Sequence, residues 1–288
     1  MGERTGIEWT DSTWNPWMGC HKVSPGCKHC YAERETTRWG KDFSQVRRSK
    51  TTFDAPLRWK EPRRIFTCSF SDFFIEEADV WRDDAWEVIR QTPQHIYQIL
   101  TKRPERIAEH LPKTCFFCGM EWGPEHVGKC EDHDWRHPWY GWAIATEDMN
   151  TEAEPNTNPW PNVWLGTSVE NQKYAEERIP KLVSISAAVH FLSCEPLLGP
   201  IDFTHALRYE NPEWLKDHGY LRDIEWVIAG GESGPDYRPM DPIWIRDIRE
   251  QCKSGKVAFF FKQWGGLKPG GPRELDGREW NEFPSEAL

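Results

Sequence analysis

Three cysteines near the N-terminus have a spacing that suits an iron–sulfur cluster. Cys20, Cys27 and Cys30 lie in the string GCHKVSPGCKHC, with six and then two residues between them. Three thiolates held close together can bind three irons of a four-iron cluster, and the fourth iron then stays open for a substrate or cofactor. A turn at residues 24–26 and a predicted helix at residues 31–38 would fold the chain around the cluster and direct a helix N-terminus at its negative charge.

The same three cysteines could instead bind zinc. A structural zinc site has four ligands, and His21 or His29 would supply the fourth. By spacing alone, the zinc site and the iron–sulfur cluster are equally good interpretations, so the choice between them depends on other features of the chain.

A second group of metal-ligating residues follows the pattern C-x2-C-x11-C-x2-H. Its members are Cys115, Cys118, Cys130 and His133. Two paired knuckles at this separation are typical of a structural Zn2+ site. His126 and His137 are alternative nitrogen ligands. A short segment has too little core to fold alone, and a bound Zn2+ ion would supply the missing free energy.

Apolar runs that alternate with helical stretches must position these groups. The predicted strands are residues 65–69, 96–101, 163–167, 189–193, 226–229 and 257–262, with a further strand at 7–10. The predicted helices are residues 31–38, 78–91, 104–110, 171–182 and 242–252. Continuous apolar strands separated by helices indicate a parallel sheet that is covered on both faces. The predicted fold is therefore an α/β, open or closed βα barrel over residues 1–111 and 161–288, with a small zinc-binding insertion at residues 112–160.

Composition narrows the classes of protein further. The net charge of −10 disfavours a protein that coats DNA, although it allows a local basic groove. We expect no membrane association, because the chain contains no run of 18 apolar residues, and a cytoplasmic location, because its start is not a signal peptide. Nine cysteines in such a chain indicate metal ligands or buried thiols, and 18 tryptophans offer stacking surfaces as well as core.

Several longer strings resemble one protein family. IEWTDSTWNPWMGC with SPGCKHCYAE, and later ILTKRPER, WLGTSVENQ, LSCEPLLGPID and VIAGGESG, are similar to strings of a phage- and plasmid-encoded family that is radical-SAM-like and of unknown function. The resemblance covers nearly all of the chain except residues 112–159. One departure is the spacing of the first cysteines, because three residues and not six usually separate the first two in radical-SAM enzymes.

The resemblance implies a radical-SAM-type partial (βα)6 barrel as the fold, and it also implies a reaction. A [4Fe–4S] cluster would chelate the amino and carboxyl groups of S-adenosyl-L-methionine through its open iron. Reductive cleavage would then give a deoxyadenosyl radical that abstracts hydrogen from a substrate, while the protein positions and shields the cofactor. The electron would come from a reductant of the flavodoxin or ferredoxin type.

The resemblance also assigns roles to polar residues that follow three of the predicted strands, where ligands lie in βα barrels. The ammonium group of S-adenosylmethionine would contact Ser69, Ser71 and Asp72. The ribose hydroxyls would contact Ser168, Glu170 and Asn171. The adenine side would be formed by Gly230, Gly231 and Glu232. The alternative for each residue is a helix cap or turn position at a strand–helix junction.

Three residues at other strand ends are candidates for the chemistry on the substrate. Cys194 could donate a hydrogen atom beside the radical, although a small buried side chain is its ordinary role. Glu195 and Lys262 could bind substrate or could form an ion pair at the rim of the barrel.

Three functions follow as alternatives. The first is a radical enzyme that acts on a nucleotide or nucleic acid, which the tryptophans and the basic residues 47–50 favour. The second is a radical enzyme that acts on a peptide or small metabolite, which the acidic net charge favours. The third is a binding protein without catalysis, in which both metal sites hold zinc.

Overall fold

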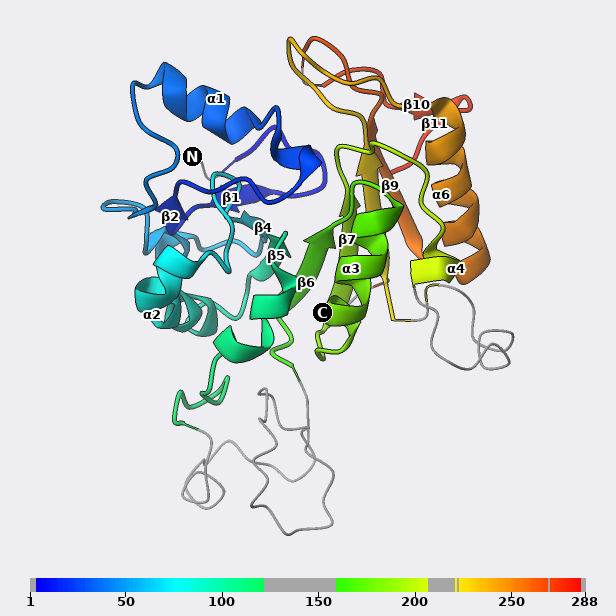
Figure 1. Cartoon of the computed structure of the whole chain (residues 1–288). Helices are drawn as coiled ribbons and strands as arrows, with labels where there is room; N and C mark the ends of the chain where they lie inside the picture. The colour runs from blue at the N-terminus through cyan, green and yellow to red at the C-terminus, as the bar shows by residue number, and fades with distance from the viewer. Residues whose placement is uncertain (1–3, 122–158, 207–220, 222, 269, 286–288) are drawn as a thin grey trace, which may run out of the picture.

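Seven parallel strands form one sheet that curls into a half barrel (Figure 1). The computed structural model describes residues 4–121, 159–206, 221, 223–268 and 270–285. The strands are, in spatial order, β1 (Ser12–Trp14), β4 (Arg64–Thr67), β5 (Ile96–Thr101), β6 (Val163–Ser168), β7 (Val189–Cys194), β8 (Trp226–Gly230) and β9 (Ala258–Gln263). Because spatial order follows chain order, each crossover returns to the next strand along, and the carboxyl ends of all seven strands meet at one edge.

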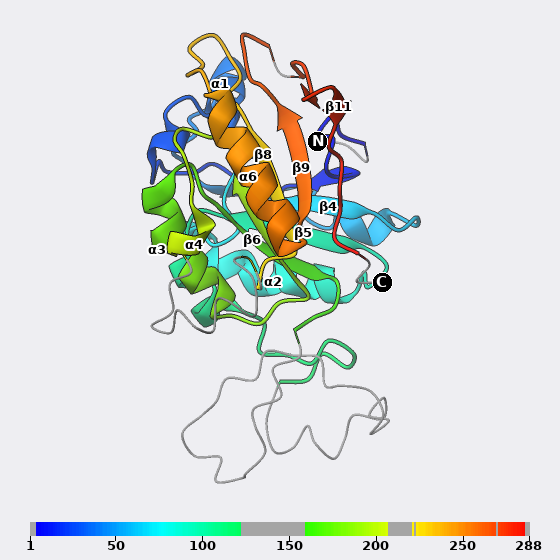
Figure 2. The same ribbon diagram turned by 90° about the vertical axis from the view of Figure 1, so that its right-hand side faces the viewer.

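Helices cover the convex face of the sheet. They are α2 (Asp79–Arg90), α3 (Gln172–Val183), α4 (Phe203–Ala206) and α6 (Pro242–Gly255). Figure 2 shows α6 lying along β8 and β9. By contrast, α1 (Tyr31–Arg38) lies at the end of the half barrel toward which β9 points (Figure 2).

Shorter elements complete the described chain. They are the two-stranded pairs β2 (Trp17–Met18) with β3 (Arg47–Arg48) and β10 (Glu274–Leu275) with β11 (Arg278–Glu279), and the 3-10 helices η1 (Pro25–Cys27), η2 (Ala55–Arg58), η3 (Glu76–Ala78), η4 (Pro104–Arg106) and η5 (Ala108–His110). The strands β2 and β3 flank residues 19–46, the segment that carries the first three cysteines.

Alternation along the strands divides the buried side chains into two clusters. On the convex face, Leu165, Leu192 and Val227 pack with the apolar sides of α2, α3 and α6. On the concave face, the intervening positions point the other way, as in Trp164 and Phe191.

Aromatic side chains fill the amino-terminal half of the concave face. The Trp226 ring lies 6.0 Å from Trp164 and 5.8 Å from Phe191, measured between ring centroids. Trp9 and Phe283 enter the same cluster from the two ends of the chain, with centroids 6.1 and 5.2 Å from Trp226. The half barrel is therefore packed at one end, and its open end is where the strands finish.

The half barrel has seven strands, one more than the six that define the predicted barrel. The position predicted for the N-terminal strand, residues 7–10, is wrong, because this strand lies at Ser12–Trp14. Thr10 explains the shift. Its hydroxyl donates to the carbonyl of Arg64 at 2.9 Å and accepts from the amide of Phe66 at 3.1 Å, so a side chain takes the place of a backbone ladder there.

Other predicted elements agree with the structure to within three residues at each end, with one exception. The predicted helix at residues 104–110 is two successive 3-10 helices. The predicted zinc-binding insertion lies mostly outside the described residues, which include only its positions 112–121 and 159–160. Among the described helices, none is both long enough and apolar enough to cross a membrane.

Candidate functional site

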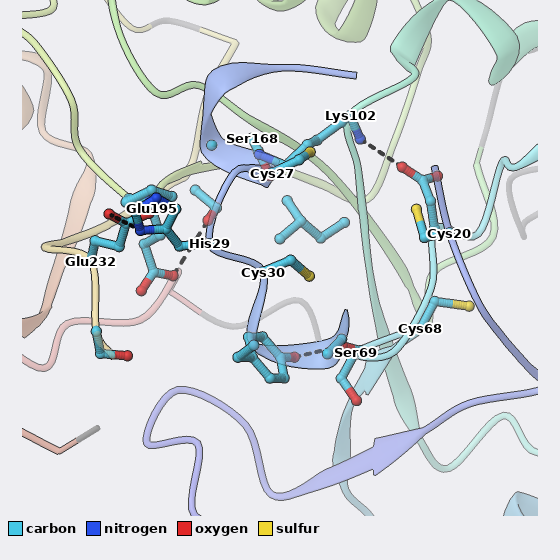
Figure 3. A pocket seen from close by; sticks show the side chains of 18 of the residues that line it. Cys20, Cys27, His29, Cys30, Cys68, Ser69, Lys102, Ser168, Glu195 and Glu232 are labelled. Atoms are coloured by element: carbon cyan, nitrogen blue, oxygen red, sulfur yellow. Dashed lines mark hydrogen bonds and ion pairs between the residues drawn. The ribbon is translucent and has the colours of Figure 1, made fainter. Parts of the chain in front are cut away.

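A cavity of about 600 Å³ lies on the concave side at the carboxyl ends of the strands. This volume is within the roughly 300–1,000 Å³ that small-molecule sites occupy. Figure 3 shows Cys20, Cys27 and Cys30 around one part of the cavity and Glu195, Glu232 and His29 on the side opposite Cys20. Trp9, Phe66 and Leu100 form its apolar floor.

Local backbone structure places each of the three cysteines. Cys20 follows β2, and its amide donates to the carbonyl of Phe43 at 2.9 Å. Cys27 ends the 3-10 helix η1, and Cys30 is the N-cap of α1. The predicted helix after the third cysteine is thus confirmed, and its N-terminus lies beside Cys30.

The three cysteines line one cavity but do not converge on the position of a single ion. Four ligands on one zinc, each about 2.3 Å from it, bring their sulfurs within roughly 4 Å of each other. Among the described residues, no three His, Cys, Asp or Glu side chains converge closely enough to hold one ion. A four-iron cluster instead gives each thiolate its own iron, so the thiolates stand farther apart around a common space.

The two histidines that could complete a zinc site differ in their surroundings. His21 pairs with the carboxylate of Glu77 through Nε2. The buried Nδ1 atom of His29 lies 3.7 Å from Glu232 Oε2 and makes no hydrogen bond to the described residues. Burial raises the pKa of Cys20 to about 12 and also raises the pKa of Cys30. Both are therefore thiols until a metal displaces their protons.

Glu170 joins the cysteine loop to the sheet. Its buried carboxylate pairs with Lys102, lies 3.1 Å from Arg178 Nη1, and accepts a 2.5 Å hydrogen bond from Ser24 Oγ. Gly26 is required at the contact, because a Cβ there would lie 2.5 Å from Glu170 Oε1. The prediction that Glu170 binds ribose therefore does not fit its surroundings: it is absent from the cavity wall and holds the loop instead.

Replacing Glu170 by Gln should lower the free energy of unfolding by about 3–5 kcal/mol. The change leaves the cations of Lys102 and Arg178 without a negatively charged partner in a buried site. Urea unfolding measures the loss. Glu177→Gln, an exposed change on the same helix α3, is the matched control and should cost less than about 0.5 kcal/mol. An equal effect of the two changes would contradict the role of Glu170.

The pH dependence of this effect has a definite sign. Burial acts to raise the pKa of Glu170, but Lys102 and Arg178 outweigh it and hold the pKa below its ordinary value of 4.5. Because the folded-state pKa is the lower one, ionised Glu170 stabilises the fold above about pH 4.5, and this stabilisation is lost as the pH falls through the folded-state pKa. The stability difference between wild type and Glu170→Gln should therefore shrink below pH 4.5.

Asp72 lines the cavity, but its oxygens already accept from the protein. Thr101 Oγ1 donates at 2.7 Å, and the amides of Phe74 and Lys102 donate at 2.9 Å each. Arg103 Nη1 donates at 3.0 Å. With four donors and 4% exposure, Asp72 is poorly placed to hold an ammonium group, and it positions Arg103 instead.

Ser69 and Ser71 also line the cavity, and both hold the loop that follows β4. Asn15 Nδ2 donates to Ser69 Oγ at 2.9 Å, and Ser71 Oγ donates to the carbonyl of Gly19 at 2.5 Å. The Ser71 bond fixes the residue directly before Cys20. These serines thus support the cysteine loop as well as facing the cavity.

The end of β8 is fixed in a similar way. Glu232 accepts from Arg238 Nε at 2.8 Å and from Arg238 Nη2 at 2.5 Å. Gly231 is required there because a Cβ would lie 2.1 Å from the carbonyl oxygen of Trp264. The close contact at this glycine is thus with the protein's own backbone. Gly231 and Glu232 line the cavity, whereas Gly230 does not.

The polar residues after β6 divide between the cavity and the helix. Ser168 lines the cavity (Figure 3). Asn171 is the N-cap of α3, and its Oδ1 accepts from the amide of Tyr174 at 3.4 Å. Asn171 therefore has the capping role that was its alternative, and it does not face the cavity.

Of the candidates for substrate chemistry, Glu195 and Lys262 line the cavity together. Lys262 Nζ lies 3.0 Å from Glu195 Oε1, and Ser193 Oγ donates to Glu195 Oε2 at 3.3 Å. Cys194 does not face this cavity: it is fully buried on the convex side, in the cluster that includes Cys252. Cys194 is therefore not placed to donate a hydrogen atom into this cavity, because Ser193 and Glu195 point to the cavity and the residue between them points away.

The structure describes two of the four residues of the predicted zinc site, Cys115 and Cys118. The amide of Cys115 donates to the carbonyl of Met120, and the amide of Gly119 donates to the carbonyl of Cys115, each at 2.9 Å. Burial raises the pKa of Cys115, as does a hydrogen bond with the Cys118 thiol, while backbone amides act in the opposite direction. The two thiols are thus adjacent on a tight turn. Cys130 and His133 lie outside the described residues.

Sequence reasoning missed several residues on the cavity wall, among them Glu8, Arg34 and Ser193. Ser193 could have been found from the period of two along β7. Glu8 carries no such signal, because it lies on a turn before β1 that has no regular pattern. Arg34 lies on α1, whose bounds were predictable but whose cavity-facing side was not.

A family model described as "Protein of unknown function (DUF5131)" matches residues 4–284. No curated protein and no solved structure matches the chain. The resemblance to a radical-SAM-like phage and plasmid family is therefore corrected: the family found is this one, and nothing in the match indicates the radical-SAM superfamily. Because the match spans nearly the whole chain, the protein belongs to the DUF5131 family of proteins of unknown function.

Proposed function

We propose that Cys20, Cys27 and Cys30 hold a [4Fe–4S] cluster and that the cavity binds S-adenosylmethionine for reductive cleavage. The observation that carries the proposal is that three cysteines line one small-molecule-sized cavity without converging on a single ion. When bound, the cluster would supply one electron to the sulfonium, and cleavage would give methionine and a deoxyadenosyl radical.

The chain's own residues would prepare this reaction. The Ser24–Glu170 and Ser71–Gly19 hydrogen bonds hold the cysteine loop against the sheet. The apolar floor, which includes Trp9, excludes water from the reacting end of the cavity. Ser168, on the wall, is placed to accept and donate hydrogen bonds with ribose hydroxyls.

The pair Glu195–Lys262 is suited to a substrate. It presents a carboxylate and an ammonium group side by side on the cavity wall, and both side chains are partly exposed. A substrate with a neighbouring donor and acceptor, such as a nucleobase edge or an amide, could bind both groups at once. A nucleotide therefore stays a proposed substrate, with a peptide or small metabolite as the alternative. Salt-dependent binding to a single-stranded oligonucleotide would favour the first.

The test of the proposed function is deoxyadenosine formation. Protein loaded with iron under anaerobic conditions, reduced with dithionite and given S-adenosylmethionine, should form deoxyadenosine and methionine. Protein without iron should form neither. Electron delivery in the cell would come from a reductant of the flavodoxin or ferredoxin type, for which dithionite substitutes in the test.

We also propose that the pair Cys115–Cys118 binds Zn2+ with Cys130 and His133. About one zinc per chain should remain after Cys20, Cys27 and Cys30 are all replaced by Ala. Adding Cys115→Ser should remove it, as measured by elemental analysis. Cys252→Ser, a change at a buried cysteine on α6, is the control that should leave zinc in place. Zinc that survives Cys115→Ser would contradict the assignment.

A further inference from the structure

Arg103 donates toward one of the three cysteines from a buried position. Its Nη1 atom lies 3.8 Å from Cys20 Sγ and 3.0 Å from Asp72 Oδ2, and its Nη2 atom donates to the carbonyl of His21 at 3.2 Å. Arg103 is 9% exposed, so water screens its charge weakly.

The position of Arg103 is fixed from the side away from the cysteine. Asp72 accepts a hydrogen bond from the guanidinium. Its carboxylate is itself held by Thr101 Oγ1 and by two backbone amides. The Arg103 amide in turn donates to Thr101 Oγ1 at 2.9 Å. A guanidinium has five N–H groups in a rigid plane, so it can contact the carboxylate, the carbonyl and the sulfur at the same time.

The other two cysteines have weaker partners. Cys27 lies 3.7 Å from the hydroxyl of Ser24, and Cys30 receives backbone amides from the first turn of α1. A full, buried cation beside a thiolate therefore distinguishes Cys20. Hydrogen bonds to the sulfurs and local charge are among the factors that set the reduction potential of an iron–sulfur cluster.

We propose that Arg103 and Asp72 together set the reduction potential of the cluster at Cys20, with Arg103 raising it and Asp72 lowering it. This inference rests on the proposed function, because it requires the cluster. Reduction adds one electron from the reductant to the cluster, and no bond in the protein breaks. The added negative charge is stabilised by the guanidinium at Cys20 and opposed by the carboxylate behind it.

The test is the midpoint potential of the cluster, followed by electron paramagnetic resonance during titration with dithionite. Arg103→Met should lower the midpoint enough to reduce the ratio of reduced to oxidised cluster about tenfold at a fixed potential, which corresponds to about 59 mV for one electron. Asp72→Asn should shift it in the opposite direction, because it removes the carboxylate charge and leaves the guanidinium. A purely structural role would not produce shifts of opposite sign.

Arg106→Met is the matched control. Arg106 lies one turn further on, bonds to Asp79 and to the carbonyl of Phe74, and should leave the midpoint unchanged. Iron content is measured first for each protein. If Arg103→Met fails to load iron, the upward shift of Asp72→Asn carries the test.

Two results would overturn the inference while the proposed function stands. These are an unchanged midpoint in fully loaded Arg103→Met, and shifts of the same sign in Arg103→Met and Asp72→Asn. A wild-type protein that takes up no iron would overturn the proposed function, and this inference with it.

Discussion

Alanine in place of Cys20, Cys27 or Cys30 should reduce the iron content of anaerobically reconstituted protein from about four atoms per chain to nearly none. Each thiol would be the ligand of a different iron, so the loss of one leaves an iron without its protein ligand. Cys20 is also the thiol that Arg103 contacts, and its loss leaves a buried cation without that partner. Iron and sulfide analysis, with the visible absorption of the cluster, measures the effect.

Two buried cysteines provide matched controls for these changes. Cys194, at the end of β7, and Cys252, on α6, lie in the same buried cluster on the convex face. Cys194→Ala and Cys252→Ala remove a thiol of the same size and should keep the full iron content. Full iron in Cys27→Ala, or zinc bound at the three cysteines in place of iron, would show that these residues do not form the cluster.

The strands of the half barrel were predictable because most of their residues are apolar. A strand buried on both faces has few polar positions, and the runs at β5, β6 and β7 stand out from the polar turns around them. The first strand was misplaced because Thr10 replaces a backbone ladder with its own hydroxyl, and a single sequence does not display such a contact.

The carboxylates at the strand ends were predicted as ligand contacts for a related reason. Asp72, Glu170 and Glu232 do follow strands at the correct edge of the sheet. Their partners come from other segments, however: Ser24, for example, lies 146 positions before Glu170. The sequence indicated which residues reach the edge, but not which of them are already paired with Arg and Lys side chains.

The candidate site itself was predicted from a pattern that is local. Two of the three cysteines lie within one short turn that leads into α1. Glu195 follows β7, and Lys262 lies near the end of β9, and both strand ends are clear in the sequence. The side of β7 that faces the cavity was also predictable, because successive residues of a strand point to opposite faces of the sheet. This two-residue period would have assigned Ser193, and not Cys194, to the cavity.

Deoxyadenosine formation is the second large effect expected, because it needs every part of the proposed site at once. The three thiolates must hold the cluster, the cavity must hold the cofactor, and the apolar floor must keep water away. Removing the cluster should therefore abolish the product. The pair Glu195–Lys262 lines the cavity, and Glu195 lies on the side opposite Cys20 (Figure 3). Removing this pair should therefore leave slow cleavage in the absence of substrate.

The measurement that tests the central claim most directly is deoxyadenosine formed per chain beside iron content, in the same anaerobic sample. Wild type and Glu195→Gln should hold about four irons and form deoxyadenosine from S-adenosylmethionine after reduction with dithionite, whereas Cys27→Ala should hold almost no iron and form none. Wild-type protein that holds a full cluster, is reduced, and yet forms no deoxyadenosine would contradict the claim.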